Sequence, residues 1–261
     1  MIAARPIQDG DLWQLVVSLP AGTDAGPDTL RQALATRAGR PDVRITDVHW
    51  VSEWRYNLRM ASRYRHGPAF LAGDAAHVHS PAGGHGMNTG IQDAYNLGWK
   101  LGLVLRGAAP DSLLDTYEAE RMPVAEAILA DSDRQFGRLR GSRIPRPLLG
   151  RIMKAHLVRL HRNAGNDHPT YPPGLLIGAG GGRPAPDGRT PTGARLFDLF
   201  RGSHFTVLAP GPVPGIDLDF VRTYRTASAR DYTIVRPDGY IALSAPDQAP
   251  VIGYFHRIAV G

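Results

Sequence analysis

The sequence predicts a mixed fold: an α+β N-terminal part followed by a small α/β unit. Three observations lead to this prediction. Strand-forming runs, alternating at residues 12–19 and rich in β-branched and aromatic residues at 43–60, lie on either side of a helical segment. Apolar residues recur every three or four positions between 91 and 128, as expected for helices, and short β-type runs return between 196 and 243. With 43% hydrophobic and 21% charged residues in 261, the chain is typical of a globular protein.

The first sixty residues predict a hairpin, a helix and one or two further strands. Ile2–Pro6 and Leu12–Leu19 flank a turn-forming segment and are expected to pair. Residues 27–38 have helical spacing after a proline, and Gly39 supplies a stop. Residues 43–60, VRITDVHWVSEWRYNLRM, are rich in β-branched and aromatic side chains, which favours strands of an antiparallel sheet.

Two helices are predicted next. The first has an apolar face from Ile91 to Leu105, made by residues at steps of three or four. The second begins near Asp111 and is expected to bend at Pro123. Together they form a helical hairpin. A third amphipathic helix is expected within the basic stretch from Gly137 to Asn166, which contains no acidic residue.

We interpret the basic stretch as a solvated helix face, because no aromatic or recognition-helix pattern that would indicate nucleic acid accompanies it. Residues 166–195 are dense in Gly and Pro, so we place a domain boundary near Gly174 and interpret GAGGG at 178–182 as linker. Beyond it, 205–208, 233–235 and 240–243 are strand candidates around a Pro-Asp-Gly turn.

Composition excludes several chemistries. The chain has no cysteine, which removes disulfides, thiolate nucleophiles and cysteine zinc sites. Ser80 has histidine neighbours but no nucleophile elbow, so hydrolase chemistry is disfavoured. No apolar run reaches the roughly 18 residues of a membrane helix, and the first residues do not resemble a signal peptide, so we expect a cytoplasmic protein without a membrane partner.

The segment that carries chemistry is residues 70–106, FLAGDAAHVHSPAGGHGMNTGIQDAYNLGWKLGLVLR. A strand leads into a turn where Gly73 permits close backbone approach and Asp74 can offer an acceptor to a polyol hydroxyl. The glycines at 83, 84 and 86 leave backbone N–H groups bare before a helix, which favours an anionic ligand such as the pyrimidine edge of a reduced flavin. The alternative is that these glycines only shape a tight turn capped by Asp74.

The string GDAAHVHSPAGGHGMNTGIQDAYNLGWKL resembles the second FAD signature of the class A flavin-dependent aromatic hydroxylases, which have the p-hydroxybenzoate hydroxylase fold, and TYEAERMPVAEAIL continues the likeness. The resemblance implies that the aspartate binds the ribityl chain of FAD, the proline lies against the isoalloxazine ring, and the following backbone meets the pyrimidine edge. The cofactor-binding residues implied in this way are Asp74, Pro81, Gly83, Gly84, Gly86, Met87 and Asn88.

The likeness extends to both ends of the chain. The initial sheet resembles part of the family's substrate domain, and RTPTGARLFDLFRGSHFTVLA with IVRPDGYIALSA resembles the thioredoxin-like C-terminal domain of antibiotic-modifying and polyketide hydroxylases. The expected organisation is therefore a substrate-sheet remnant (1–68), the second FAD segment with the helical hairpin (69–140), a basic helical connection (141–174) and a thioredoxin-like domain (175–261). Without cysteine, that last domain is not expected to be redox active.

Two further sets of side chains are candidates. Arg55, Tyr56, Asn57 and Arg59 belong to a strand expected near the substrate cavity, where arginine could hold an enolate or phenolate; purely structural roles are the alternative. The histidines at 77, 79 and 85 have metal-ligand spacing, but the resemblance places no metal there. No residue is assigned as catalytic.

The G-x-G-x-x-G fingerprint that binds the ADP pyrophosphate in this family is not found in the sequence. Three hypotheses follow. The chain is part of an FAD- and NADPH-dependent hydroxylase of an aromatic or polyketide substrate; or it is a remnant repurposed as a non-redox cyclase or isomerase; or it is a non-catalytic partner of a complete hydroxylase. In each case the Ile91–Leu105 helix face is expected to need a partner, either a second copy or another chain.

Overall fold

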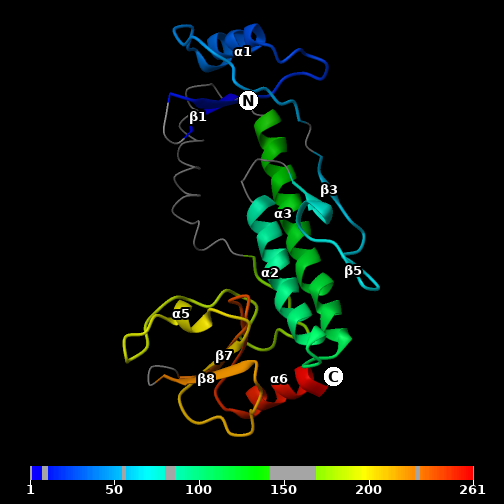
Figure 1. Ribbon diagram of the computed structural model, residues 1–261, viewed down its shortest axis with the longest axis vertical. Coiled ribbons are helices and arrows are strands. Elements are labelled where there is room, and N and C mark those ends of the chain that lie inside the picture. The colour runs from blue at the N-terminus through cyan, green and yellow to red at the C-terminus, as the bar shows by residue number, and fades with distance from the viewer. Residues whose placement is uncertain are drawn as a thin grey trace. The chain divides into compact units, whose positions relative to one another are not determined.

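A computed structural model describes residues 2–7, 11–54, 57–79, 86–141, 169–226 and 230–260. The chain separates into two compact units, residues 1–55 and 56–261, and each is described by itself (Figure 1). The predicted domain boundaries near residues 68, 140 and 174 stay a prediction.

The first unit contains a hairpin and a short helix. Strand β1 (Ile2–Pro6) pairs antiparallel with β2 (Trp13–Val17), which confirms the predicted hairpin. Helix α1 (Pro27–Ala33) has a proline in its first turn and continues as the π-helical segment η1 (Leu34–Ala38). It ends at Gly39, whose φ of 66° is in the left-handed region that glycine adopts without strain. The predicted helix and its stop are therefore confirmed.

The predicted strands between residues 43 and 60 are mostly absent. Within the described part of this segment, only β3 (Arg59–Met60) is a strand, and residues 43–54 form no regular secondary structure. Trp50 and Trp54 are 76% and 56% exposed. Strand propensity is a preference for a pleated, half-buried surface, and these exposed side chains are not packed on such a surface in the described residues.

Short strands open the second unit. β3 pairs antiparallel with β6 (His77–Val78), and β4 (Arg65–His66) pairs with β5 (Ala69–Phe70). Between β5 and β6 the chain makes the 3-10 turn η2 (Gly73–Ala75). Together these elements place the predicted chemical segment on a turn and a strand directly before the first long helix.

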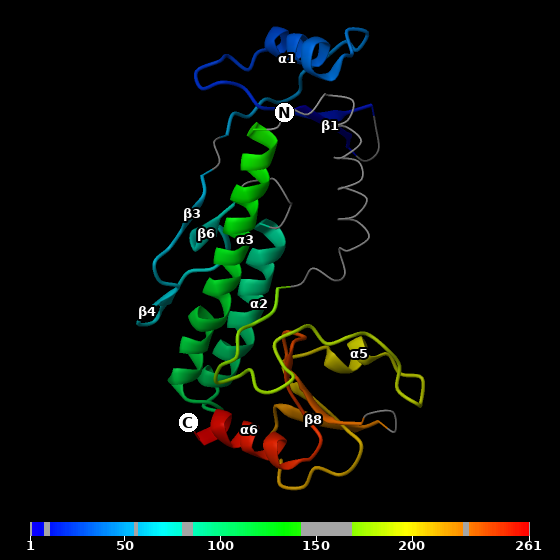
Figure 2. The same cartoon turned by 180° about the vertical axis from the view of Figure 1, so that it is seen from behind.

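Two long helices form the predicted hairpin. α2 (Gly86–Leu105) and α3 (Asp115–Gly141) are joined through the 3-10 turn η3 (Asp111–Leu114) and lie side by side in both views (Figures 1 and 2). Pro123 lies inside α3. None of the helices in the described residues is long and apolar enough to span a membrane.

The buried side of α2 differs from the predicted apolar face. Ile91 and Leu105 are 60% and 82% exposed, whereas the buried side carries mostly polar residues together with Leu97, Trp99 and Leu103. The buried polar residues of this helix are Thr89, Asp93, Asn96 and Lys100. Both ends of the predicted apolar face are therefore exposed, and Glu120 and Arg121 of α3 supply charged partners for Lys100 and Asp93 on the buried side.

The C-terminal part is a four-stranded sheet in the order β10-β9-β7-β8. β7 (Phe205–Ala209) runs parallel to β8 (Val221–Arg225), while β9 (Tyr232–Val235) and β10 (Ile241–Ala245) are antiparallel additions. Two helices accompany the sheet, α5 (Leu196–Phe200) and α6 (Ala249–Val260). Residues 210–220, which connect the two parallel strands, contain no helix. The small α/β unit predicted from the sequence is confirmed, although β8 and α6 were not predicted.

One core joins this sheet to the helical hairpin. Trp99 and Leu103 of α2 belong to the same buried cluster as Phe205 of β7 and Tyr254 and Phe255 of α6. The Trp99 and Phe205 rings meet edge to face, with centroids 5.3 Å apart. The hairpin and the sheet are therefore parts of one packed body.

The GAGGG segment is not a linker. Its backbone runs along β10, where Gly178 N–H donates to Ala242 O at 2.8 Å and Gly182 N–H donates to Ile241 O at 2.8 Å. A Cβ on Gly181 would lie 2.3 Å from Ala242 O, so glycine is required by close backbone approach. The predicted helix in the basic stretch lies outside the described residues.

Candidate functional site

The turn that carries Asp74 lies against the first turns of α2. Gly73 has a φ of 58°, and a Cβ on Gly90 would lie only 3.1 Å from Gly73 Cα. The two glycines therefore let the turn and the helix approach more closely than other residues would permit. Asp74 itself is exposed on this turn. The contact between the glycines was not predicted from the sequence.

Three of the implied cofactor-binding residues, Gly86, Met87 and Asn88, form the first turn of α2. Backbone N–H groups in a first helical turn have no partner within the helix, and the helix dipole makes this end attractive to anions. Met87 is 76% exposed. Because Gly90 is one turn further along, the turn with Asp74 lies beside this end of the helix. Pro81, Gly83, Gly84 and His85 lie outside the described residues.

The predicted substrate-binding residues are only partly described. Asn57 and Arg59 are exposed, while Arg55 and Tyr56 lie outside the described residues. Arg59 is opposite Val78, so it belongs to the strand that pairs with the segment leading to the flavin-ring loop, residues 80–85. Their role in substrate binding stays a prediction.

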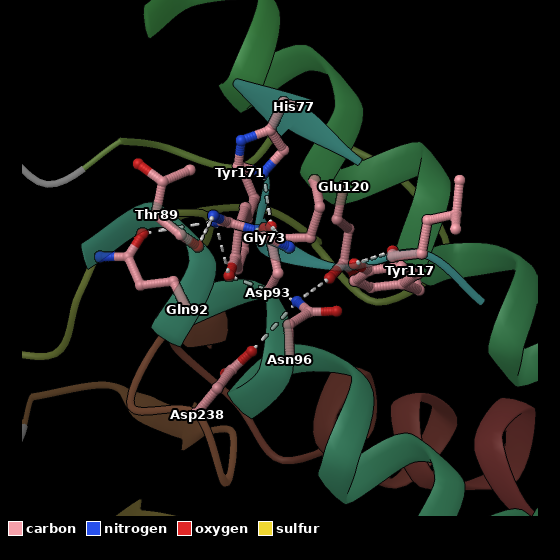
Figure 3. A network of polar contacts seen from close by, with 12 residues as sticks. Gly73, His77, Thr89, Gln92, Asp93, Asn96, Tyr117, Glu120, Tyr171 and Asp238 are labelled. Atoms are coloured by element: carbon pink, nitrogen blue, oxygen red, sulfur yellow. Dashed lines mark hydrogen bonds and ion pairs between the residues drawn. The ribbon is translucent and has the colours of Figure 1, made fainter. Parts of the chain in front are cut away.

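A buried network lies directly behind the turn (Figure 3). Asp93 Oδ1 accepts a hydrogen bond from Arg121 Nε at 2.7 Å, and its Oδ2 accepts one from Gly73 N–H at 3.1 Å. The same Oδ2 is 2.5 Å from His77 Nε2, and His77 Nδ1 is 2.7 Å from His79 Nε2. Asp93 and Arg121 are completely buried, so the turn before the flavin-ring loop is fixed from inside the protein.

A second group of charges continues from there toward the C-terminal sheet. Glu120 Oε2 accepts hydrogen bonds from Lys100 Nζ at 2.9 Å, Asn96 Nδ2 at 2.8 Å and Arg236 Nη2 at 2.8 Å. Arg236 Nη1 donates to Glu120 Oε1 at 2.8 Å, and its Nη2 donates to Asp238 Oδ2 at 2.6 Å. Each buried charge in this group thus faces an opposite charge, which is the condition under which buried ions are tolerated.

These contacts set the ionisation of the carboxylates. Burial opposes the charge of Glu120, but Arg236 and Lys100 outweigh it and lower the pKa of Glu120 to about 2. Burial also opposes the charge of Asp93, and the hydrogen bond from His77 together with Arg121 holds its pKa below the ordinary value. Burial lowers the pKa of Lys100 to about 8 against the attraction of Glu120.

Tyr171 connects the two groups. Its hydroxyl oxygen accepts long hydrogen bonds from Arg121 Nη1 at 3.4 Å and Asn96 Nδ2 at 3.3 Å, and its ring stacks on Tyr240 at 4.1 Å. The guanidinium of Arg236 lies 5.0 Å from the centre of the Tyr171 ring. Sequence reasoning did not find this network. The polar residues of α2 at 89, 93, 96 and 100 recur at helical spacing, and that pattern could have indicated it.

The residues present fit a flavin. Gly73 and Gly90 bring the turn against the helix at a distance that a Cβ on Gly90 would crowd, an exposed carboxylate stands on this turn, and the first turn of α2 lies beside it. A carboxylate suits the hydroxyls of a ribityl chain, and N–H groups suit the oxygens of a pyrimidine ring. This arrangement is the one expected of a flavin-binding protein.

Comparison with known proteins agrees with this class. The family model described as "FAD binding domain" matches residues 14–132. A "Flavin-dependent monooxygenase" of Mycobacteroides abscessus is 40% identical over 241 residues, which are 88% of this chain and 48% of that protein. The chain belongs to the FAD-dependent aromatic hydroxylases, and the predicted fold class is confirmed.

Solved structures show the same likeness. The OxyS anhydrotetracycline hydroxylase from Streptomyces rimosus superposes with a TM-score of 0.72 at 30% identity, covering 100% of this chain and 58% of that one. The Diels-Alderase PyrE3 of pyrroindomycin biosynthesis superposes with a TM-score of 0.71 at 30% identity, covering 99% of this chain and 56% of that one. The chain thus spans about half the length of the relatives it matches.

Proposed function

We propose that this chain supplies the flavin-ring site of an FAD- and NADPH-dependent monooxygenase that hydroxylates an aromatic or polyketide natural product. The observation that carries the proposal is the Gly73–Gly90 approach, which holds Asp74 beside the start of α2. The hydroxylase and monooxygenase names of the relatives support the reaction class. NADPH is the proposed reductant, used once a nucleotide-binding part is present.

In this proposal each part of the site has one task. Asp74 holds the ribityl hydroxyls, and the N–H groups of the first turn of α2 hold the pyrimidine edge of the ring. Bound FAD supplies the activation of molecular oxygen, using electrons from NADPH. The buried network around Asp93 keeps the turn rigid, so that the cofactor-binding groups are held in place before binding. Asn57 and Arg59, together with Arg55 and Tyr56, are the proposed contacts to the substrate.

The test is FAD retention by the purified chain, measured by visible absorbance after gel filtration. Asp74→Ala is expected to lose the flavin, because the exposed carboxylate would no longer hold the ribityl chain. Asp219→Ala is the matched control, since Asp219 is also exposed but lies between β7 and β8. Equal flavin content in the two variants would show that the ribityl assignment is wrong.

A second candidate function is a non-redox cyclase or isomerase of secondary metabolism. The specific observation in its favour is the likeness to PyrE3, which is a Diels-Alderase and not a hydroxylase by name. The two candidates differ in their need for electrons. Turnover of a substrate by folded protein under anaerobic conditions, without NADPH, would favour the second candidate and contradict the first.

The exposed side of α2 supports a proposed protein contact. Met87, Ile91 and Leu105 leave 76%, 60% and 82% of their surface exposed, and Tyr95 is also exposed on this helix. Exposed apolar residues grouped along one helix indicate an interaction surface. We propose that the occupant is the nucleotide-binding part of a hydroxylase, because this chain covers only about half of its relatives. If this chain is instead a non-catalytic partner of a complete hydroxylase, it would dock through the same surface.

Co-expression tests this contact. The part of the Mycobacteroides abscessus relative that this chain does not cover is expected to co-purify with the chain, and Ile91→Glu is expected to abolish the association. Phe197→Glu is the control, because Phe197 is an exposed apolar residue on α5. Self-association of the chain in sedimentation analysis, lost in Ile91→Glu only, would instead identify a second copy as the occupant.

A further inference from the structure

Three side chains form a hydrogen-bonded chain that ends at the flavin-ring loop. Asp93 lies on α2, His77 is the first residue of β6, and His79 immediately precedes residues 80–85. His77 lies between the other two, with Nε2 2.5 Å from Asp93 Oδ2 and Nδ1 2.7 Å from His79 Nε2. His77 is 1% exposed and Asp93 is fully buried, so water does not compete for the contact between these two side chains.

The Asp93 carboxylate determines which atom donates in each hydrogen bond of this series. Asp93 already accepts hydrogen bonds from Arg121 and Gly73, and an ionised carboxylate has no proton to donate. The proton between Asp93 and His77 therefore belongs to His77 Nε2. In the neutral ring Nδ1 is then the acceptor, so the hydrogen between the two histidines belongs to His79 Nε2. The lone pair of His79 is consequently at its Nδ1.

We infer that Asp93 is a positioning residue that fixes, through His77, which nitrogen of His79 carries the proton at the start of the flavin-ring loop. This extends the proposed function and rests on it for the identity of the ligand. The same logic applies to the serine protease triad, where exchange of the aspartate for asparagine leaves the geometry but imposes the wrong histidine tautomer.

The arrangement also determines the local charge. In the described part of the network, three cations (Lys100, Arg121 and Arg236) balance three carboxylates (Asp93, Glu120 and Asp238). The groups facing His77 are Asp93, His79 and the Tyr64 ring, whose centre is 6.0 Å away. The described charges of the network thus cancel, so a cationic histidine pair would place one net positive charge at His79, and such a charge favours an anionic ring edge over a neutral one.

The direct test is nitrogen NMR of the chain without FAD, with ¹⁵N-labelled histidine. At about pH 8, above the ordinary histidine pKa of about 6.5, neutral rings report their tautomer through nitrogen shifts and couplings. His77→Gln and His79→Gln assign the two signals among the ten histidines. Both rings are expected as Nε2–H tautomers. An Nδ1–H tautomer at His77 in the unaltered chain would overturn the inference without any further variant.

The Asp93→Asn variant is expected to reverse donor and acceptor in both hydrogen bonds of His77. With the amide oxygen in the place of Oδ1, where it keeps the Arg121 hydrogen bond, the amide nitrogen takes the place of Oδ2. It then loses the hydrogen bond from Gly73 N–H and faces His77 Nε2, which must accept. Both rings are therefore expected to switch to Nδ1–H. Asp238→Asn is the matched control, because it removes a charge from the same network without touching either histidine. A folded Asp93→Asn with unchanged tautomers, or a switch in Asp238→Asn, contradicts the inference.

A second readout concerns the bound flavin. In a preparation that holds FAD, His79→Gln is expected to weaken the reduced form relative to the oxidised form by about tenfold, which lowers the two-electron potential by about 30 mV. His49→Gln, at an exposed site, is the control and should leave the potential unchanged. An unchanged potential in His79→Gln refutes the charge effect. Failure of FAD to bind at all refutes the proposed function and leaves the tautomer result standing.

Discussion

Replacing Glu120 by glutamine is expected to destabilise the unit of residues 56–261 by about 3–5 kcal/mol, the usual cost of breaking a buried ion pair. Glu120 receives two hydrogen bonds from Arg236 and one each from Lys100 and Asn96. Glutamine keeps the volume but removes the negative charge and one acceptor oxygen. Lys100 and Arg236, both fully buried, would then lack their shared counter-charge.

The pKa of Glu120 gives a similar magnitude. The pKa falls from the ordinary 4.5 to about 2 in the folded protein. At about 1.36 kcal/mol per pKa unit, this difference corresponds to about 3 kcal/mol of stability. Because the folded pKa is the lower one, this stabilisation is fully present above about pH 4.5. It is lost as the pH falls toward 2, and the Glu120→Gln variant should lack this part of the acid sensitivity.

Urea unfolding followed by tryptophan fluorescence measures the effect. Trp99 is the one tryptophan of residues 56–261, and the guanidinium of Arg236 lies 5.2 Å from its ring centre, so its emission reports on the network. Asp111→Asn is the control, since its ion pair with Arg65 involves an exposed carboxylate and is expected to contribute at most about 1 kcal/mol. A Glu120→Gln variant within about 0.5 kcal/mol of the original, with the same acid profile, would refute the reasoning.

Two glycine substitutions test the close approaches. Gly90→Ala is expected to lower the free energy of unfolding by about 1–3 kcal/mol and to reduce FAD retention, because its Cβ would press on Gly73. Gly98→Ala is the control: a Cβ there would meet nothing within 4 Å, so the same unfolding assay should show no change or a gain of up to about 1 kcal/mol. Gly181→Ala should be more destabilising than Gly90→Ala in thermal unfolding, because its Cβ would lie 2.3 Å from Ala242 O, and equal stabilities would contradict the account of that segment.

Elements defined by their own local sequence could be predicted. The hairpin at residues 2–17 follows from alternation around a turn, and α1 follows from a proline start and the left-handed Gly39. The strand, turn and helix order of the flavin segment also came from local signals. The family motif directed attention to Asp74 and the start of α2, which the structure places beside one another through Gly73 and Gly90.

Features that depend on distant partners could not be predicted in this way. Residues 43–54 have strand-forming composition, but they pair with no strand of the described residues. The face of α2 that is buried was decided by Glu120, Arg121 and Arg236, which come from other elements. The GAGGG segment has the composition of a linker, and only the register of β10 beside it explains why glycine is needed there.

The C-terminal hairpin takes part in the candidate site although it lies far from the motif in sequence. Arg236 and Asp238 flank the β9–β10 turn, and both are hydrogen-bonded to residues of α2 or α3. Removing them would leave Lys100 with a single carboxylate and Glu120 without its strongest partner. Through Tyr171 the same hydrogen-bond network reaches Arg121 and Asp93, and from there the turn that presents Asp74. The position of the turn that carries Asp74 therefore depends on a part of the chain that contributes no residue to the implied flavin contacts.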